Sequence, residues 1–365
     1  MNKLLTPVRI GRYIAPNRLV MAPMTRSRAT DDGVPGDITL TYYAQRASAG
    51  LIITEGVFPS AMGKGYVHTP GIVSDQQVAA WTKITEAVHA RGGRIFMQLM
   101  HCGRISHPSL LDGAIPVAPS AIKPEGKAWT NAGQVDYVTP RELGLNEIPG
   151  VIDEFRQATR RALEAGFDGV ELHAASGYLP EQFLSSGSNH RQDQYGGAVE
   201  NRARFILEVL QAMVAEAGGD RVGIKISPEM NYNSITDADP QATYTYLVKH
   251  LGKFNLAYLH VALFGAKTDY HALLRPLFAH TYLMGSGLAK DSAEAALTDN
   301  KADAAVFGSA FLANPDLPER FRTGAALNTP DRNTFFAPPT AQGYIDYPTL
   351  GGLGELEGLG GSEAA

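Results

Sequence analysis

Short apolar runs alternate with longer amphipathic stretches along most of this chain, and that alternation limits its fold more than any other feature. A buried parallel strand is typically a short apolar run, and each pair of parallel strands needs a crossover, usually a helix. Eight runs fit this description: Arg18–Met21, Leu51–Thr54, Arg94–Leu99, Asp168–Leu172, Val222–Ile226, Ala257–Val261, Thr281–Met284 and Ala304–Phe307. We therefore predict one closed (β/α)8 barrel, a TIM barrel, over residues 1–350, rather than a doubly wound open sheet.

Helix signals occupy the intervals between these runs. Asp37–Ala49 is predicted to be a helix that ends at Gly50. Ser74 and Gln77 have the capping-box spacing that begins a helix. The stretch Val151–Ala165 has its apolar residues on one helical stripe. These signals are typical of an α/β chain in which helices follow strands.

Two segments fall outside the repeat. Residues 100–148 form a long excursion after the third strand, rich in Pro and Gly. A loop of this length in a compact domain is usually functional, and we expect it to roof part of a site. Residues 351–365 are Gly-rich without apolar periodicity, so we predict a disordered tail.

Composition excludes several classes of function. A net charge of −5 gives no electrostatic basis for binding nucleic acid or an anionic membrane. The one cysteine, Cys102, excludes an intrachain disulfide and favours a reducing compartment. The N-terminus lacks a signal-peptide core, and no stretch approaches the roughly 18 apolar residues of a membrane helix. We expect a cytoplasmic protein, a monomer or homodimer, that acts on small molecules.

The most informative segment is residues 169–205. Its apolar strand ends abruptly at His173, and Ser176 and Tyr178 follow. Each of these residues alone is most simply a satisfied polar cap of a buried strand. As a group, followed by a polar and Gly-rich stretch, they indicate a site at the carboxyl end of a barrel strand, where such barrels carry their catalytic groups.

The ends of the other strands provide further candidates. They are Pro23, Met24 and Thr25 after the first strand, Gly56 after the second, Gln98 and Met100 at the third, Lys225 in the fifth, Gly285, Ser286 and Gly287 after the seventh, and Gly308 and Ser309 after the eighth. Small-residue turns after strands seven and eight favour a phosphate held by backbone N–H groups.

Residues 169–205 carry a resemblance to a known family. The matching positions are His173, Tyr178, Asn189, Arg191, Asp193, Tyr195, Gly196, Gly197, Asn201, Arg202, Arg204 and Phe205. In this pattern the chain resembles the old yellow enzyme family of FMN-dependent alkene reductases, and similarity extends from about Pro7 to Leu350. Ser176 departs from the pattern, because the family has Asn at that position.

The resemblance implies a non-covalent FMN site. Pro23, Met24 and Thr25 would run along the flavin ring, with Gly56 nearby, and Gln98 would bind its pyrimidine edge. Lys225 stands where the family usually has Arg, so it keeps the positive charge but lacks the planar, forked hydrogen-bond donors of a guanidinium. Ser309 stands where the family often has an Arg that pairs with the phosphate. The resemblance also implies that residues 7–16 form a hairpin across the bottom of the barrel.

The resemblance further implies a ping-pong alkene reduction with NADPH or NADH as the reductant. Its substrates would be enones, maleimides and nitroalkenes, with nitrate esters as a further class. Tyr178 would donate the proton, and His173 and Ser176 would clamp the substrate oxygen. Tyr66 and Tyr344 resemble residues of the pocket wall, although a core or surface tyrosine is nearly as good an interpretation for each. Met100 would also line the pocket, where relatives commonly have an aromatic residue, so one wall would be wider or softer.

Three other readings compete. A phosphate-binding lyase or isomerase without flavin would want a Schiff-base lysine or paired carboxylates, and Lys225 has no such pair beside it. A metal hydrolase would want spaced ligands, but His101, His107, His173 and His190 form no such pattern, so no metal is expected. A non-catalytic binding module is difficult to reconcile with so many polar strand ends.

Overall fold

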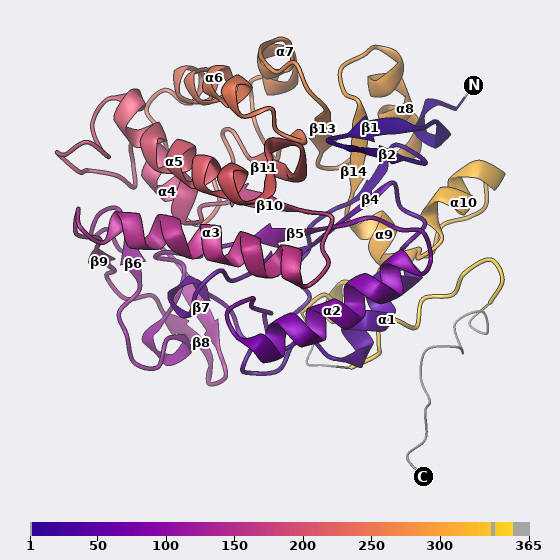
Figure 1. Ribbon diagram of the computed structural model, residues 1–365, viewed down its shortest axis with the longest axis horizontal. Helices are drawn as coiled ribbons and strands as arrows, with labels where there is room; N and C mark the ends of the chain where they lie inside the picture. Colours follow the sequence, from indigo (N-terminus) through magenta and orange to yellow (C-terminus); the bar gives the residue numbers. More distant parts are fainter. Residues whose placement is uncertain (1, 337–339, 353–365) are drawn as a thin grey trace.

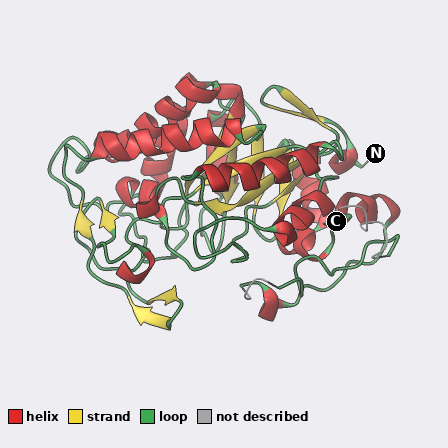
Figure 2. Ribbon diagram, turned by 60° about the horizontal axis from the view of Figure 1, so that its bottom comes forward, coloured by secondary structure: helices red, strands yellow, loops and turns green. Residues whose placement is uncertain are grey.

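Eight parallel strands close into a barrel, as the alternation predicts (Figure 2). The computed structural model describes residues 2–336 and 340–352. Around the barrel the strands are β3 (Leu19–Met21), β4 (Leu51–Val57), β5 (Ile95–Leu99), β10 (Gly169–Ala174), β11 (Val222–Ile226), β12 (Tyr258–Ala262), β13 (Tyr282–Gly285) and β14 (Ala304–Phe307). β14 pairs with β3 and closes the ring, which excludes an open sheet. The predicted tail lies outside the described residues from 353 onward.

Helices surround the strands, and α2, α3 and α5 lie side by side on one face of the molecule (Figure 1). The α-helices are α1 (Asp37–Gln45), α2 (Asp75–His89), α3 (Ile148–Glu164), α4 (Leu179–Leu184), α5 (Val199–Ala217), α6 (Pro240–Leu251), α7 (Tyr270–Leu274), α8 (Lys290–Thr298), α9 (Ser309–Ala313) and α10 (Leu317–Thr323). Short 3-10 helices span Lys3–Leu5, Ala61–Gly63, Pro108–Leu110, Gly219–Arg221, Gly252–Phe254, Arg275–Leu277 and Arg332–Thr334. Among the described residues, no helix combines the length and apolarity needed to cross a bilayer.

Local sequence accounts for the helix ends. Ser74 Oγ accepts a hydrogen bond from the backbone N–H of Gln77 at 3.2 Å, and the Ser74 N–H donates one to Gln77 Oε1 at 3.1 Å, so the predicted capping box is confirmed. The first predicted helix is shorter than expected: α1 ends at Gln45, because the backbone then makes tight turns that lead into β4. α3 begins at Ile148, three residues before its predicted start.

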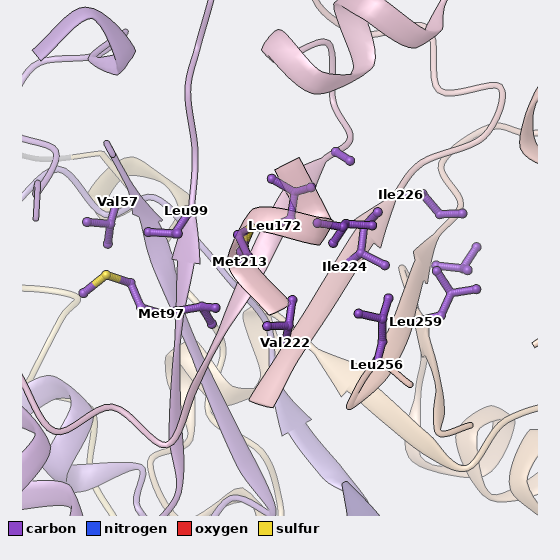
Figure 3. Close-up of a cluster of buried hydrophobic side chains, with 14 of the residues drawn as sticks. Val57, Met97, Leu99, Leu172, Met213, Val222, Ile224, Ile226, Leu256 and Leu259 are labelled. Carbon is purple, nitrogen blue, oxygen red and sulfur yellow. The ribbon is translucent and has the colours of Figure 1, made fainter. Parts of the chain in front are cut away.

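Most of the hydrophobic core lies between the strands and the helices (Figure 3). Alternate residues of β5, β10, β11 and β12, among them Leu99, Leu172, Ile224 and Leu259, pack outward in this layer, and Met213 of α5 joins them. Because side chains alternate along a strand, the residues between them point into the barrel. The alternation of side chains along each strand therefore provides residues both for the outer core and for the interior of the barrel.

The bottom of the barrel has its own apolar cluster. β1 (Val8–Ile10) and β2 (Tyr13–Ala15) form the predicted antiparallel hairpin. Ile10 and Ala15 pack with interior residues such as Phe96 and Tyr258. The hairpin thus closes the amino ends of the strands and leaves the carboxyl ends to carry polar groups.

The long excursion after β5 folds into two small sheets. One pairs β6 (Val117–Ala118) with β9 (Arg141–Glu142), and the other is the hairpin of β7 (Lys127–Thr130) and β8 (Gly133–Asp136). Ala128 and Val135 from that hairpin pack with Met100 and Tyr178, so the excursion covers part of the barrel mouth. This agrees with the roofing role that its length predicts.

Three buried arginines attach the C-terminal segment to the barrel. Arg26 donates to the carbonyl of Gly343 at 2.8 Å, and Arg28 to that of Thr334 at 2.8 Å. Arg46 donates to the carbonyls of Tyr42 and Leu312, at 2.8 and 2.6 Å, and its guanidinium lies 3.9 Å from the centre of the Tyr42 ring. Burial lowers the pKa of Arg46 to about 10, so it remains charged at neutral pH.

Replacing Arg46 by alanine is expected to lower the free energy of unfolding by about 3 kcal/mol, because it leaves several buried carbonyls without donors. Denaturant unfolding followed by circular dichroism measures the change. Arg160 is a matched control, since its one ion pair with a described residue is an exposed contact with Glu164 at 3.7 Å. Arg160→Ala should change stability by less than about 0.5 kcal/mol, and equal losses in the two variants would contradict the anchoring role.

Candidate functional site

The interior of the barrel becomes polar toward the carboxyl ends of the strands. Pairing places Glu171 opposite Gln98, and Lys225 opposite both His173 and His260. Because the outward neighbours of these residues belong to the outer core, their own side chains face inward. Four adjacent strands therefore bring five polar side chains together above the apolar bottom.

Glu171 lies at the centre of this group and is fully buried. Its carboxylate accepts a hydrogen bond from Gln98 Nε2 at 2.7 Å and lies 3.1 Å from His260 Nδ1. These bonds fix the Gln98 amide in one orientation, with its Nε2 committed to Glu171. The amide oxygen of Gln98 makes no hydrogen bond within the described residues and can accept one from a ligand.

Lys225 is a partly buried cation beside this carboxylate. Burial lowers the pKa of its ammonium, and the charge of Glu171 opposes that shift. Within residues 2–336 and 340–352, no hydrogen bond or ion pair is made by its Nζ. A cation in this position needs acceptors from a ligand, and the pyrimidine edge of a flavin offers them.

The two predicted phosphate turns lie at the ends of neighbouring strands. Ser286 and Gly287 have φ angles of +86° and +67°, and Gly308 precedes the first residue of α9, Ser309. The hydroxyl of Ser286 is buried and has no hydrogen-bond partner among the described residues. Such an orphaned donor at a turn is compatible with a phosphate oxygen. Ser309 is exposed, so its side chain and the N–H groups of the turn are open to a ligand.

The remaining cofactor candidates surround the same mouth. Pro23, Met24 and Thr25 follow β3 and are partly exposed. Gly285 passes so close to His260 that a Cβ there would lie 2.9 Å from Nε2 of the imidazole. Gly56 contacts Met100 in the same way, since a Cβ would come within 2.5 Å of its sulfur. Both glycines are required by close approach of a neighbouring side chain.

His173 and Tyr178 lie together at the end of β10. Their rings meet edge to face with centroids 4.8 Å apart. Burial, followed by the charge of Lys225, holds the pKa of His173 well below its usual range, so the imidazole is neutral. Its Nδ1 is buried without a hydrogen-bond partner among the described residues. Such a nitrogen is available to a bound ligand.

Tyr178 is held from the opposite side by Tyr66. Their hydroxyls are 3.0 Å apart, and their rings are perpendicular. Burial raises the pKa of the Tyr178 phenol well above its usual value, so it is protonated across the neutral range. Tyr66, Met100 and Tyr178 belong to one cluster that also contains Tyr137 of the roof. The structure thus brings three of the predicted substrate-side residues together.

Ser176 occupies the tight turn between His173 and Tyr178. Its φ angle is +59°, in the left-handed region. Its N–H donates to Ser227 Oγ at 2.8 Å, and its carbonyl accepts from Asn233 at 2.8 Å. The Ser176 hydroxyl lies 3.8 Å from the sulfur of Met230, a weak contact. The turn is fixed mainly through its backbone, which leaves the side chain lightly held.

Tyr344 lies elsewhere, and its assignment to the pocket wall needs correction. The side chain is fully buried and stacks on Tyr42, with ring centroids 4.1 Å apart. The guanidinium of Arg28 lies 4.6 Å from the centre of the Tyr344 ring. The tyrosine is therefore part of the arginine anchor of the C-terminal segment, which corresponds to the core interpretation left open by the sequence.

Sequence reasoning missed several residues of the site. Glu171 and His260 lie inside two of the apolar runs and are not among the predicted site residues. A polar residue inside a buried strand does indicate a side chain that faces the barrel interior. Tyr137, Met230 and Asn233 come from loops, whose paths no periodicity predicts. Only the folded chain brings Met230 and Asn233 to Ser176, and Tyr137 into the cluster of Tyr178.

Comparison with known proteins agrees with this geometry. Residues 3–328 match the NADH:flavin oxidoreductase / NADH oxidase family. The chain is 42% identical to putative 12-oxophytodienoate reductase 4 of Oryza sativa subsp. japonica, covering 95% of this chain and 93% of the relative. It is 39% identical to 12-oxophytodienoate reductase 2 of Arabidopsis thaliana, covering 95% and 96%.

Solved structures give the same result. Morphinone reductase in complex with tetrahydroNAD has a TM-score of 0.91 and 48% identity, covering 95% of this chain and 97% of that one. The old yellow enzyme homologue from Zymomonas mobilis has a TM-score of 0.93 and 42% identity, covering 95% and 99%. The resemblance to the old yellow enzymes is thereby confirmed, and a barrel enzyme without flavin is excluded. The chain belongs to the NADH:flavin oxidoreductase / NADH oxidase family, and it is an FMN-dependent oxidoreductase that takes its electrons from a reduced nicotinamide nucleotide.

Proposed function

We propose that this protein reduces the activated C=C bonds of enones, maleimides and nitroalkenes. The observation that carries the proposal is the pairing of a neutral His173, which has an unpartnered buried nitrogen, with a protonated Tyr178 at a ring distance of 4.8 Å. One group is suited to bind an oxygen and the other to supply a proton. Conjugate reduction of an alkene beside a carbonyl or nitro group needs both.

Residues at the barrel mouth would hold the cofactor. Gln98 and Lys225 would meet the pyrimidine edge of the flavin, and the turns at Ser286 and Ser309 would meet its phosphate. Bound FMN would supply two-electron carrier chemistry between a reduced nicotinamide and an alkene. The ammonium of Lys225 would favour negative charge beside it, so it is expected to raise the reduction potential of the bound flavin.

His173 and Ser176 would stabilise the charge that develops on the substrate oxygen. A fixed donor in a site shielded from water is most effective where charge appears in the transition state. His173 is rigid because it ends a barrel strand. The Ser176 hydroxyl is shorter and contacts Met230, so it would form the weaker half of the clamp.

Tyr178 would deliver the proton to the α-carbon. Its raised pKa keeps the phenol protonated, and the Tyr66 hydroxyl at 3.0 Å orients it and can share the charge as the proton leaves. The β7–β8 hairpin and Tyr137 pack over this side and limit access of water. These features support a general acid that acts inside a covered cleft.

Tyr178→Phe tests the proton donor. Reduction of the bound flavin by NADPH should remain within a few-fold of the parent, whereas reoxidation by 2-cyclohexenone should slow by about 10²–10⁴-fold. Nitroalkenes should suffer less, because a nitronate can leave and take its proton from water. Anaerobic stopped-flow absorbance measures both half-reactions. Equal loss in both would indicate damaged packing instead of a missing proton.

The two clamp residues are tested by a set of three variants. His173→Ala should slow enone-driven reoxidation by about 10²–10³-fold, whereas Ser176→Ala should slow it by less than about tenfold. Ser176→Asn should increase turnover of 2-cyclohexenone, because Asn tolerates the left-handed backbone and its amide reaches further. If Ser176→Ala is as harmful as His173→Ala, the serine is a full donor. If Ser176→Asn abolishes turnover, the clamp is built around serine.

Ser309→Arg tests the phosphate end of the cofactor site. A charge-assisted contact contributes roughly 1.5–3 kcal/mol, so the variant should slow FMN release on dilution by about tenfold or more. Ser48→Arg is the matched control, because it adds the same charge before β4, at the opposite end of the barrel. Unchanged release from Ser309→Arg, or equal slowing in both variants, would contradict this placement of the phosphate.

A further inference from the structure

Glu181 is a buried carboxylate immediately beyond the substrate-side turn. It lies in α4, is fully buried, and forms no ion pair with any residue in the described part of the chain. One oxygen accepts the N–H of Gly177 at 2.6 Å. The other accepts the hydroxyl of Tyr244, and the hydroxyl of Ser227 lies 3.5 Å away. Both oxygens are therefore engaged, one directly by the turn and the other by Tyr244 and by Ser227, which itself binds the turn.

These contacts hold two consecutive residues in an unusual backbone conformation. Ser176 and Gly177 have φ angles of +59° and +78°. The Ser176 N–H donates to Ser227 Oγ at 2.8 Å, and Ser227 in turn approaches Glu181. Left-handed backbone at a non-glycine residue persists only where its surroundings enforce it. Glu181 thus restrains the N–H of Gly177 directly and the preceding N–H, that of Ser176, through Ser227.

This turn connects His173 to Tyr178. A shift in the backbone at Ser176 and Gly177 would move the Ser176 hydroxyl and the Tyr178 ring together. We propose that Glu181 is a positioning residue, whose ionised carboxylate keeps the turn in the shape that the substrate clamp and the proton donor need. The inference rests on the proposed function for the roles of Ser176 and Tyr178, but the restraint on the turn is a property of the protein alone.

The groups around Glu181 determine how it responds to pH. α6 contributes the Tyr244 hydroxyl, and the loop before α6 contributes Asp237, which is engaged by Arg202 of α5 at 3.7 Å. Burial raises the pKa of Glu181 to about 7, although the hydrogen bonds from Tyr244, the Gly177 N–H and Ser227 oppose the shift. Asp237 adds to the rise.

The sign of the effect follows from these contacts. Above about pH 7 the carboxylate accepts from the turn with full charge, and below it a neutral acid accepts more weakly. The competent turn should therefore be lost as pH falls. Between about pH 8 and about pH 6 the ionised fraction falls roughly tenfold, and the rate of enone-driven reoxidation should fall with it.

Three variants isolate this effect in the FMN-loaded enzyme. Glu181→Gln should lower the rate at pH 8 and flatten the profile, because no titration remains at that position. Tyr244→Phe removes a donor that lowers the pKa of Glu181, so its inflection should move to higher pH. Glu208→Gln is the matched control, since Glu208 also accepts a tyrosine hydroxyl, that of Tyr195 at 2.7 Å, but on α5. It should keep the profile of the parent.

Hydrogen–deuterium exchange of residues 174–184, measured without any alkene, separates this inference from the proposed function. Glu181→Gln should speed exchange of this segment at pH 8 by about tenfold or more relative to the parent and to Glu208→Gln. If the parent reduces no alkene but this difference appears, the proposed function fails and the positioning role stands. An unchanged exchange rate in Glu181→Gln, or an unchanged inflection in both Glu181→Gln and Tyr244→Phe, would overturn the positioning role.

Discussion

The contact between the fully buried Glu171 and the groups around it is the interaction on which the site depends. A carboxylate at the core of a barrel is stable only if donors and a cation surround it, and here Gln98 and His260 contact it while Lys225 supplies the charge. Each partner comes from a different strand, so these contacts form only when neighbouring strands pair in the observed register. A slip of one residue in any of these strands would place a polar or charged side chain in the outer core.

Three substitutions relative to the family pattern act on different parts of one reaction. Lys225 keeps a positive charge without the planar guanidinium of Arg, Ser309 would leave the phosphate side without a charge, and Ser176 would shorten one arm of the proposed clamp. In the proposed site the first change would affect the reduction potential of the cofactor, the second its retention, and the third the fit of the substrate. Because these effects would be separable, the proposed site could differ from the family pattern in cofactor affinity and substrate selectivity while the hydride chemistry stayed the same.

Most of the fold was predictable because strand period and helix caps are local signals. All eight barrel strands and the capping box at Ser74 follow from such patterns. The site was only partly predictable: strand ends identified His173, Tyr178 and Lys225, but the path of the turn at Ser176 depends on Ser227 and Asn233, which are distant in sequence. The pocket-wall prediction for Tyr344 was wrong because the sequence does not distinguish an aromatic residue that lines a cleft from one buried in the core. The stack of Tyr344 on Tyr42 in the structure makes that distinction.

Closure of the barrel has a consequence for biosynthesis. β3 near the N-terminus pairs with β14, and the arginines that follow β3 bind carbonyls beyond residue 330. During translation the first strand therefore waits with an unpaired edge until almost the entire chain has left the ribosome. Contacts between the ends of a chain slow folding and expose intermediates to aggregation. A nascent chain of this protein is thus expected to need chaperone protection until synthesis is nearly complete, and its early strands are the segments that such protection must cover.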